Sequence, residues 1–229
     1  KSSFPWQGFG PISHDQQSIL ESVTRLLNDK LTPIQQRDFD QKGTAPYEIM
    51  TDLANLGLFG MPFPERYGGT DIEWDTIALL QYTMGKTAYM AASLLNRSIG
   101  FGGMPILIFG SPEQKEKILP QVVKGEALFA LALSEPGAGS DANAIISRAT
   151  PMKSGGWQLK GSKIWVSDAK ASSYIVVACK TKSTDEVEGI SLFLMPPDTK
   201  GLSITPMDKV GTHWMPSFSL GLVNVTLPE

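Results

Sequence analysis

The sequence has very little cysteine or histidine. It contains one cysteine, Cys179, and two histidines, His14 and His213, among 229 residues. A single cysteine excludes an intrachain disulfide, and three widely separated side chains of these types argue against a zinc or iron site. Cys179 ends the apolar run 174–179, which is typical of a small buried side chain. We therefore expect no bound metal.

Strong charge and long apolar stretches are also missing. The formal net charge is −3, the sequence pI is about 5.5, and there is no run of lysine or arginine. This composition argues against electrostatic binding to nucleic acid or to an anionic membrane surface. No stretch approaches the length of a transmembrane span, and the pattern of a secretory leader is absent. We expect a globular protein of the cytoplasm or the mitochondrial matrix that is not secreted.

The spacing of apolar residues changes near residue 127, from helical before it to strand-like after it. In the first half, Ser13 and Ser111 each stand three residues before a glutamine, which is the spacing of a capping box at the start of a helix. Pro120 is expected to end the second of these helices. We therefore predict an N-terminal helical domain over residues 1–127.

The second half contains short apolar runs separated by charged residues, proline or glycine. Lys160 and Gly161 are expected to form the turn of a short hairpin. The apolar alternation of the last run changes phase near Leu222, which indicates a β-bulge. A helical half followed by a β half argues against a doubly wound sheet. We predict an α+β chain whose middle β domain spans residues 128–229.

A glycine-rich motif at 134–141 directly follows the apolar residues 131–133. Gly137 and Gly139 can adopt positive φ and allow a ligand to approach the backbone, so that successive N–H groups can converge on a phosphate. Taken alone, the motif is more typical of an ordinary surface turn. No strand opens into G-x-G-x-x-G and no P-loop is present, so neither of those phosphate sites is predicted.

Four segments together resemble the acyl-CoA dehydrogenase family, in the family's order: 64–69, 110–115, 134–141 and 161–167. The resemblance covers most of the chain. It implies a helical domain, a β-barrel-like middle domain and a C-terminal four-helix bundle, of which this chain lacks the bundle. In the family the bundle supplies the catalytic glutamate, much of the FAD site and the core of the homotetramer. We therefore assign no catalytic residue here, and expect the N-terminal portion of a longer enzyme or, alternatively, a subunit completed by a partner.

The resemblance implies an FAD-dependent oxidoreductase of fatty acid metabolism. Such an enzyme removes the α-proton and the β-hydride of an acyl thioester to give a trans-2-enoyl product, and an electron-transferring flavoprotein is the expected acceptor. The thioester carrier is coenzyme A or an acyl carrier protein. Two alternatives stay open: a flavin-dependent monooxygenase of the same fold, and a non-catalytic subunit of a flavoprotein assembly.

Five residues are implied to bind the cofactor when the family's motifs are carried over by position. Leu133 would offer backbone groups, and Ser134 its hydroxyl, to the flavin pyrimidine edge. Ser140 would lie near the phosphate and pantetheine region, and so would also contact substrate. Trp165 would lie along the flavin ring, and the hydroxyl of Ser167 would bond N5, since a hydroxyl can both donate and accept.

These five assignments have structural alternatives. Trp165 would instead fill the core of the β domain, and Ser134 and Ser140 would only cap the turn. Serine at 134 and 167 also departs from the threonine that is more frequent in the family, which removes the methyl group that stiffens χ1.

Four charged residues near the motifs have less specific interpretations. Glu135 and Asp141 are at least as well explained as acids that bond their own turn. Asp168 stands where the family often has asparagine. Arg97 lies where the family shapes its acyl pocket and could meet an acidic acyl tail, but we expect it to face solvent.

Overall fold

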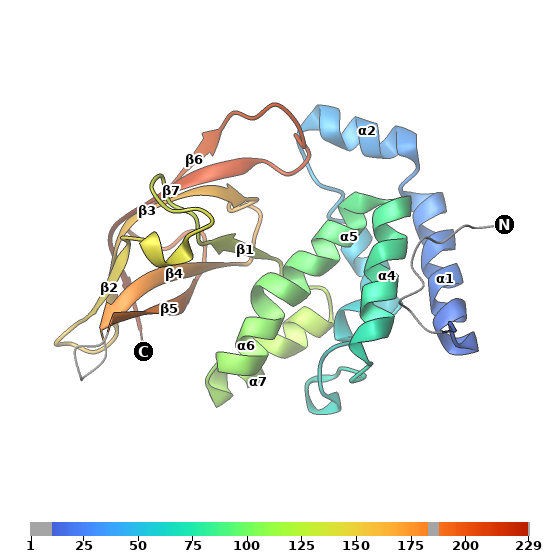
Figure 1. Ribbon diagram of the computed structural model, residues 1–229, viewed down its shortest axis with the longest axis horizontal. Coiled ribbons are helices and arrows are strands. Elements are labelled where there is room, and N and C mark those ends of the chain that lie inside the picture. Colours follow the sequence, from blue (N-terminus) through green and yellow to red (C-terminus); the bar gives the residue numbers. More distant parts are fainter. Residues whose placement is uncertain (1–10, 183–187, 229) are drawn as a thin grey trace.

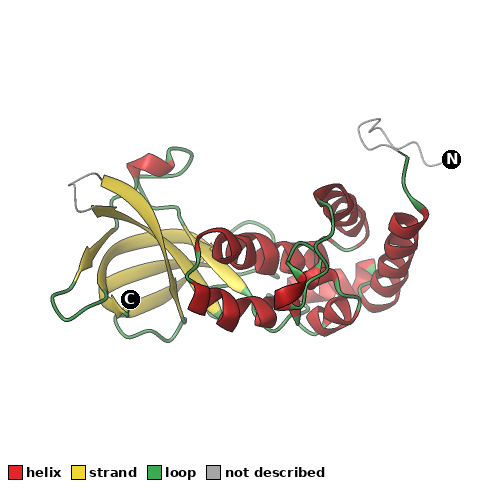
Figure 2. Ribbon diagram, turned by 90° about the horizontal axis from the view of Figure 1, so that it is seen from below, coloured by secondary structure: helices red, strands yellow, loops and turns green. Residues whose placement is uncertain are grey.

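The computed structural model describes residues 11–182 and 188–228, which form a helical part beside a curved sheet (Figure 1). Turned by 90°, the helices and the strands occupy opposite ends of an elongated molecule (Figure 2). The α-helices are α1 His14–Lys30, α2 Pro33–Lys42, α3 Ile49–Asn55, α4 Trp74–Thr87, α5 Tyr89–Asn96, α6 Met104–Phe109 and α7 Pro112–Val123. The strands are β1 Phe129–Ala132, β2 Arg148–Pro151, β3 Trp157–Ser167, β4 Tyr174–Lys182, β5 Glu188–Met195, β6 Leu202–Met207 and β7 Ser217–Leu227. The predicted order of a helical half and a β half is confirmed.

Capping boxes begin three of the helices. The predicted boxes at Ser13 and Ser111 are present in α1 and α7, and Thr32 forms a third at α2. The prediction that Pro120 ends its helix is wrong, because α7 continues to Val123. Buried residues Leu119 and Val122 lie on both sides of the proline. Their packing outweighs the hydrogen bond that the proline cannot donate.

A continuous apolar stretch, Tyr89–Phe109, runs from α5 through a π-helical segment, Arg97–Gly103, into α6. By length and composition alone it could span a membrane, contrary to the expectation from the sequence. Half of its most apolar window is buried inside the domain, as in the central helix of a globular core. π-Helical segments are rare and are frequent at functional sites.

The sheet places the glycine-rich motif at a gap between two short strands. Strand β4 pairs with β5 along one side and with β1 and β2 along the other, and the sheet continues through β3 and β7 to β6. Within the described residues no pairing joins β5 to β6, so this curved, barrel-like sheet is open. The residues between β1 and β2, 133–147, are named the cradle loop here.

Two irregularities distinguish β3 from the prediction. The prediction of a hairpin turn at Gly161 is wrong, because β3 runs through this residue, whose φ is 150°. A Cβ at Gly161 would lie 2.1 Å from Oγ of Ser147, so the close approach of the cradle loop requires glycine. Opposite it, Leu159 pairs with Val225 and Gly161 with Leu222. The phase shift predicted near Leu222 is therefore confirmed as a bulge.

The buried thiol of Cys179 provides a first prediction. It lies in β4 with no exposed surface, and burial raises its pKa to about 11. Because the thiolate is the reactive form, the folded chain should not react with Ellman's reagent at pH 8, and denaturant should release one thiol per chain. Rapid reaction of the native protein at the rate of free cysteine would contradict this burial.

Candidate functional site

The cradle loop begins with a tight hairpin turn. The backbone N–H of Glu135 donates to the carbonyl of Ala138 at 2.9 Å, and the reverse bond measures 3.1 Å. Neither Gly137 nor Gly139 has positive φ, and a Cβ at either position would meet open space. The fold of this chain therefore does not require glycine there. The open space in front of the backbone is what a close ligand would use.

A buried ion pair fixes the cradle loop to β3. Nζ of Lys163 lies 2.7 Å from Oε1 of Glu135, both side chains are buried, and Nζ also donates to the carbonyl of Leu133 at 3.1 Å. The Glu135 carboxylate accepts backbone N–H groups of Ile146 (2.7 Å) and Ser147 (3.1 Å). Burial alone would raise the pKa of Glu135, but these hydrogen bonds outweigh burial and lower it. Glu135 is thus a structural anchor, as its alternative interpretation held.

The backbone of β3 turns Trp165 out of the sheet. Lys163 pairs with Leu220 and Val166 with Phe218, so two residues of β3, Ile164 and Trp165, face one residue of β7. Trp165 has φ of 58° and is 53% exposed. Positive φ is strained for a bulky side chain, and strain of this kind is typical of functional positions. The interpretation of Trp165 as a core residue is therefore wrong.

The cradle loop lies beside residues 164–167 of β3, which are named the Trp165 segment here. The backbone N–H of Ile164 donates to the carbonyl of Ser134 at 2.9 Å. The hydroxyls of Ser134, Ser140 and Ser167 have no hydrogen-bond partner in the described part of the chain, so all three are free to bind a ligand. By contrast, Asp141 accepts the N–H of Asn143 at 3.1 Å and caps its own turn.

A second buried ion pair involves Asp168, the residue that follows Ser167. Nη1 of Arg97 is 2.7 Å from Oδ2 of Asp168, and the two side chains are 2% and 1% exposed. The expectation that Arg97 faces solvent is wrong, because the π-helical segment packs against β1 and directs this residue inward. The sequence offered one signal for it, a lone cation within the apolar stretch 89–109. Lys163 had no such signal, because its burial in β3 is known only from the structure.

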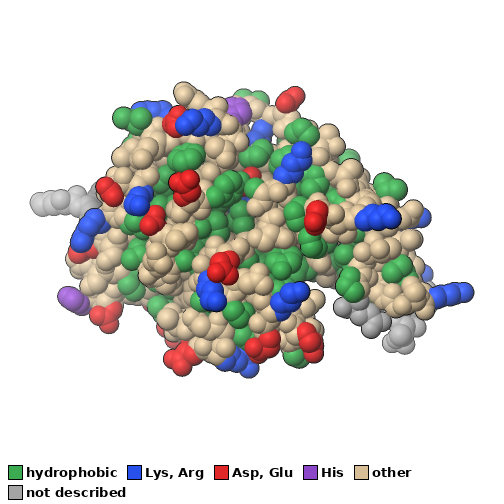
Figure 3. Space-filling model, turned by 180° about the vertical axis from the view of Figure 1, so that it is seen from behind, with side chains coloured by type: hydrophobic (Ala, Val, Ile, Leu, Met, Phe, Trp, Pro, Cys, Tyr) green, Lys and Arg blue, Asp and Glu red, His purple; other side chains and the backbone are tan. Residues whose placement is uncertain are grey.

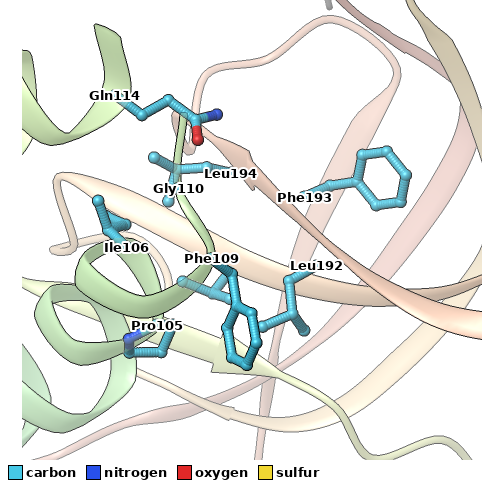
Figure 4. A pocket seen from close by; sticks show the side chains of 9 residues that line it. Pro105, Ile106, Phe109, Gly110, Gln114, Leu192, Phe193 and Leu194 are labelled. Atoms are coloured by element: carbon cyan, nitrogen blue, oxygen red, sulfur yellow. The ribbon is translucent and has the colours of Figure 1, made fainter. Parts of the chain in front are cut away.

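A pocket between the helical part and the sheet has no chemical group suited to acid–base catalysis. It lies between α6 and strands β4 and β5 (Figure 4). Its lining contains no titratable side chain: Pro105, Ile106, Phe109, Gly110, Gln114, Val176, Leu192, Phe193 and Leu194. Among the described residues no cluster of three or more histidine, cysteine, aspartate or glutamate side chains could hold a metal. Apolar side chains also gather in the middle of the broad face seen from behind (Figure 3).

Comparison with known proteins gives the same family over both parts of the chain. Residues 13–126 match the family described as "Acyl-CoA dehydrogenase, N-terminal domain", and residues 130–225 match "Acyl-CoA dehydrogenase, middle domain". A probable acyl-CoA dehydrogenase of Bacillus subtilis is 32% identical over 219 residues, which are 95% of this chain and 57% of that protein.

Solved structures agree with this similarity. Butyryl-CoA dehydrogenase of Megasphaera elsdenii superposes with a TM-score of 0.85 at 29% identity, over 96% of this chain and 58% of that one. A glutaryl-CoA dehydrogenase of Mycobacterium smegmatis, solved in complex with FADH2, gives 0.83 at 26% identity, over 94% and 54%. The chain therefore spans somewhat more than half of the length of these proteins, and over that length it belongs to the acyl-CoA dehydrogenase family.

Proposed function

We propose that the protein containing this chain is an FAD-dependent acyl-CoA dehydrogenase, which converts an acyl thioester to the trans-2-enoyl thioester. The observation that carries the proposal is that β3 presents an exposed Trp165 with positive φ two residues before the free hydroxyl of Ser167, next to Ser134 of the cradle loop. An aromatic ring and hydroxyls that can donate or accept suit a flavin ring, whose edge carries both kinds of group. The solved relative that contains FADH2 supports the same cofactor.

Each of the five predicted residues has a role in this proposal. The indole of Trp165 would pack on the ring system, and Ser167 would bond N5. Leu133 and Ser134 would bond the pyrimidine edge, although the carbonyl of Leu133 already accepts a hydrogen bond from Nζ of Lys163. Ser140 would contact the phosphate and pantetheine region. FAD, when bound, supplies the hydride acceptor.

The chain's own residues would hold this arrangement rigid. The Glu135–Lys163 pair fixes the start of the cradle loop, and the bulge in β3 sets the backbone conformation at Trp165. Preorganisation of this kind is what keeps a reacting carbon and its acceptor in line. We assign the acceptor of the α-proton to no residue of this chain.

The proposal includes the setting of the enzyme. We propose coenzyme A or an acyl carrier protein as the thioester carrier, an electron-transferring flavoprotein as the acceptor, and a homo-oligomeric assembly. We propose the cytoplasm or the mitochondrial matrix as its location. Neither a nucleic acid nor a membrane is part of the proposal, in keeping with the net charge of −3.

Anaerobic titration of the flavin-loaded protein tests the reaction. Acyl-CoA thioesters of increasing chain length and branching should bleach the yellow band of the oxidised flavin, and the enoyl product should appear in equal amount. If no thioester bleaches a bound flavin but a reductant drives oxygen consumption, the monooxygenase alternative replaces this proposal. If the protein never binds flavin, the non-catalytic alternative replaces it.

Replacing Ser167 with alanine tests the assignment of the N5 partner. The Ser167 hydroxyl bonds no described residue, so Ser167→Ala should leave the free energy of unfolding nearly unchanged. Loss of one hydrogen bond should weaken flavin binding up to about tenfold and shift the flavin absorption band. Ser154→Ala, at an exposed turn between β2 and β3, is the control and should change neither quantity. An unshifted band and unchanged affinity in Ser167→Ala would remove the residue from the site.

A further inference from the structure

The Arg97–Asp168 ion pair joins the two parts of the molecule directly behind the Trp165 segment. Arg97 begins the π-helical segment of the helical part, whereas Asp168 directly follows the last residue of β3. Their charged atoms are 2.7 Å apart and both side chains are almost completely buried. Within the described residues, Arg97 is the ion-pair partner of Asp168.

Arg97 also holds the backbone that carries Ser167. Its Nη2 donates to the carbonyl of Ser167 at 3.5 Å, while Nη1 bonds the Asp168 carboxylate, so one guanidinium contacts both residues of this peptide. The same Nη2 reaches the carbonyl of Phe129 in β1 at 3.4 Å. The planar guanidinium has a fixed fork of donors, which a lysine cannot reproduce.

Further contacts hold the Asp168 backbone in a strained conformation. Its φ is 57°, and its N–H donates to the carbonyl of Pro216 at 2.7 Å. The N–H groups of Ala171 and Ser172 both donate to its carbonyl at 3.1 Å. A strained residue persists only where its surroundings fix it, and the buried guanidinium is the charged part of those surroundings.

We infer that Arg97 is a positioning residue that holds Ser167 and Trp165 in the geometry that binds the flavin, through its ion pair with Asp168. This inference rests on the proposed function for the identity of the ligand. An aspartate at 168 introduces a buried negative charge, and Arg97 compensates it. Breaking a buried pair by removing one partner leaves an uncompensated charge, whereas removing both charges does not. The two residues should therefore be dependent on each other.

Fluorine NMR of the chain labelled with 5-fluorotryptophan tests the positioning without any flavin. The sequence has five tryptophans, and Trp165→Phe identifies the resonance of Trp165. Arg97→Met should shift or broaden that resonance, and Arg97→Met/Asp168→Asn should restore most of it. Arg37→Met, which removes an exposed arginine of α2, is the matched control and should leave it unchanged.

Flavin affinity of the folded variants is the second measurement. Arg97→Met should weaken binding about tenfold, which corresponds to about 1.4 kcal/mol, and the double variant should recover most of this loss. Arg97→Lys keeps the charge without the fork and should fall between wild type and Arg97→Met. If Arg97→Met does not fold, Arg97→Lys decides the question by the same two measurements.

An unchanged Trp165 resonance together with unchanged affinity in the folded variant would overturn the inference, as would a double variant no better than Arg97→Met. Failure of the proposed function is recognised separately, because wild-type protein would then bind no flavin or never be bleached by a thioester. The fluorine measurement is independent of that outcome.

Discussion

Replacing Lys163 with methionine is expected to lower the free energy of unfolding by about 3–5 kcal/mol. In the wild type, Nζ of Lys163 lies 2.7 Å from the Glu135 carboxylate. The variant leaves that carboxylate buried without its cation, and also removes a donor to the Leu133 carbonyl. Methionine has a similar length and fills the space, so the loss reports charge and hydrogen bonds, not a cavity. Urea denaturation followed by circular dichroism measures it.

Two further variants separate the ion pair from general damage to β3. Lys160→Met removes an exposed lysine from the same strand and should change stability by less than about 0.5 kcal/mol. Glu135→Gln combined with Lys163→Met removes both charges and should be more stable than Lys163→Met alone. If the double variant is less stable by the sum of both single losses, the two residues are not coupled and this account of the cradle loop is wrong.

The dependence of stability on acid pH is a second measurement of the Glu135–Lys163 pair. The folded-state pKa of Glu135 lies below its ordinary value of 4.5, because hydrogen bonds from Ile146, Lys163 and Ser147 outweigh burial. The carboxylate therefore contributes stability above about pH 4.5, and this contribution is lost as pH falls through the lower folded pKa. Glu135→Gln should show a smaller loss of stability over that acid range than wild type. An identical acid profile would mean that Glu135 has the same pKa in both states.

Local signals in the sequence were sufficient for much of the fold. The capping boxes at Ser13 and Ser111 and the bulge opposite Leu222 depend on neighbouring residues, and each is found where it was predicted. Pro120 and Gly161 were misplaced for a common reason. Both are usually breakers of regular structure, but packing of the surrounding residues kept α7 and β3 continuous.

The candidate site shows where sequence reasoning ends. Motif positions predicted the hydroxyls of Ser134 and Ser167 as ligand-binding groups. Only the structure shows that these hydroxyls have no other hydrogen-bond partner among the described residues. The ion pairs of Arg97 with Asp168 and of Lys163 with Glu135 join residues 71 and 28 positions apart. A single sequence offers no pairing information over such distances. It showed only that Arg97 lies within an apolar stretch, where a buried cation is costly unless it finds a partner.

Replacing Gly102 with alanine is expected to lower the free energy of unfolding by about 1–3 kcal/mol or more. Gly102 lies in the π-helical segment, where a Cβ would come within 2.1 to 2.3 Å of three ring carbons of Phe129. Phe129 has no exposed surface and stacks on Tyr174 with ring centroids 5.7 Å apart, so the ring has no free space to enter. The helical segment and β1 would have to separate.

Gly85→Ala is the matched control, because Gly85 also lies in a helix but its Cβ would meet nothing within 4 Å. This exposed helical position should gain about 0.5–1 kcal/mol of stability, since alanine is the better helix former. Opposite signs for the two glycine substitutions would identify the approach to Phe129 as the cause. Equal signs would refute it.

Gly102→Ala should also disturb the candidate flavin site, because β1 leads directly into the cradle loop and the carbonyl of Phe129 accepts a hydrogen bond from Arg97. Displacement of β1 would move Leu133 and Ser134 relative to Trp165. Flavin affinity of the folded fraction should therefore fall in Gly102→Ala and stay unchanged in Gly85→Ala. Phe129→Leu in the Gly102→Ala background makes room for the new methyl group. Recovery of flavin affinity in that double variant would show that the contact at Gly102 sets the distance between the helical part and the cradle loop. Continued loss of affinity would instead place the damage within the π-helical segment itself.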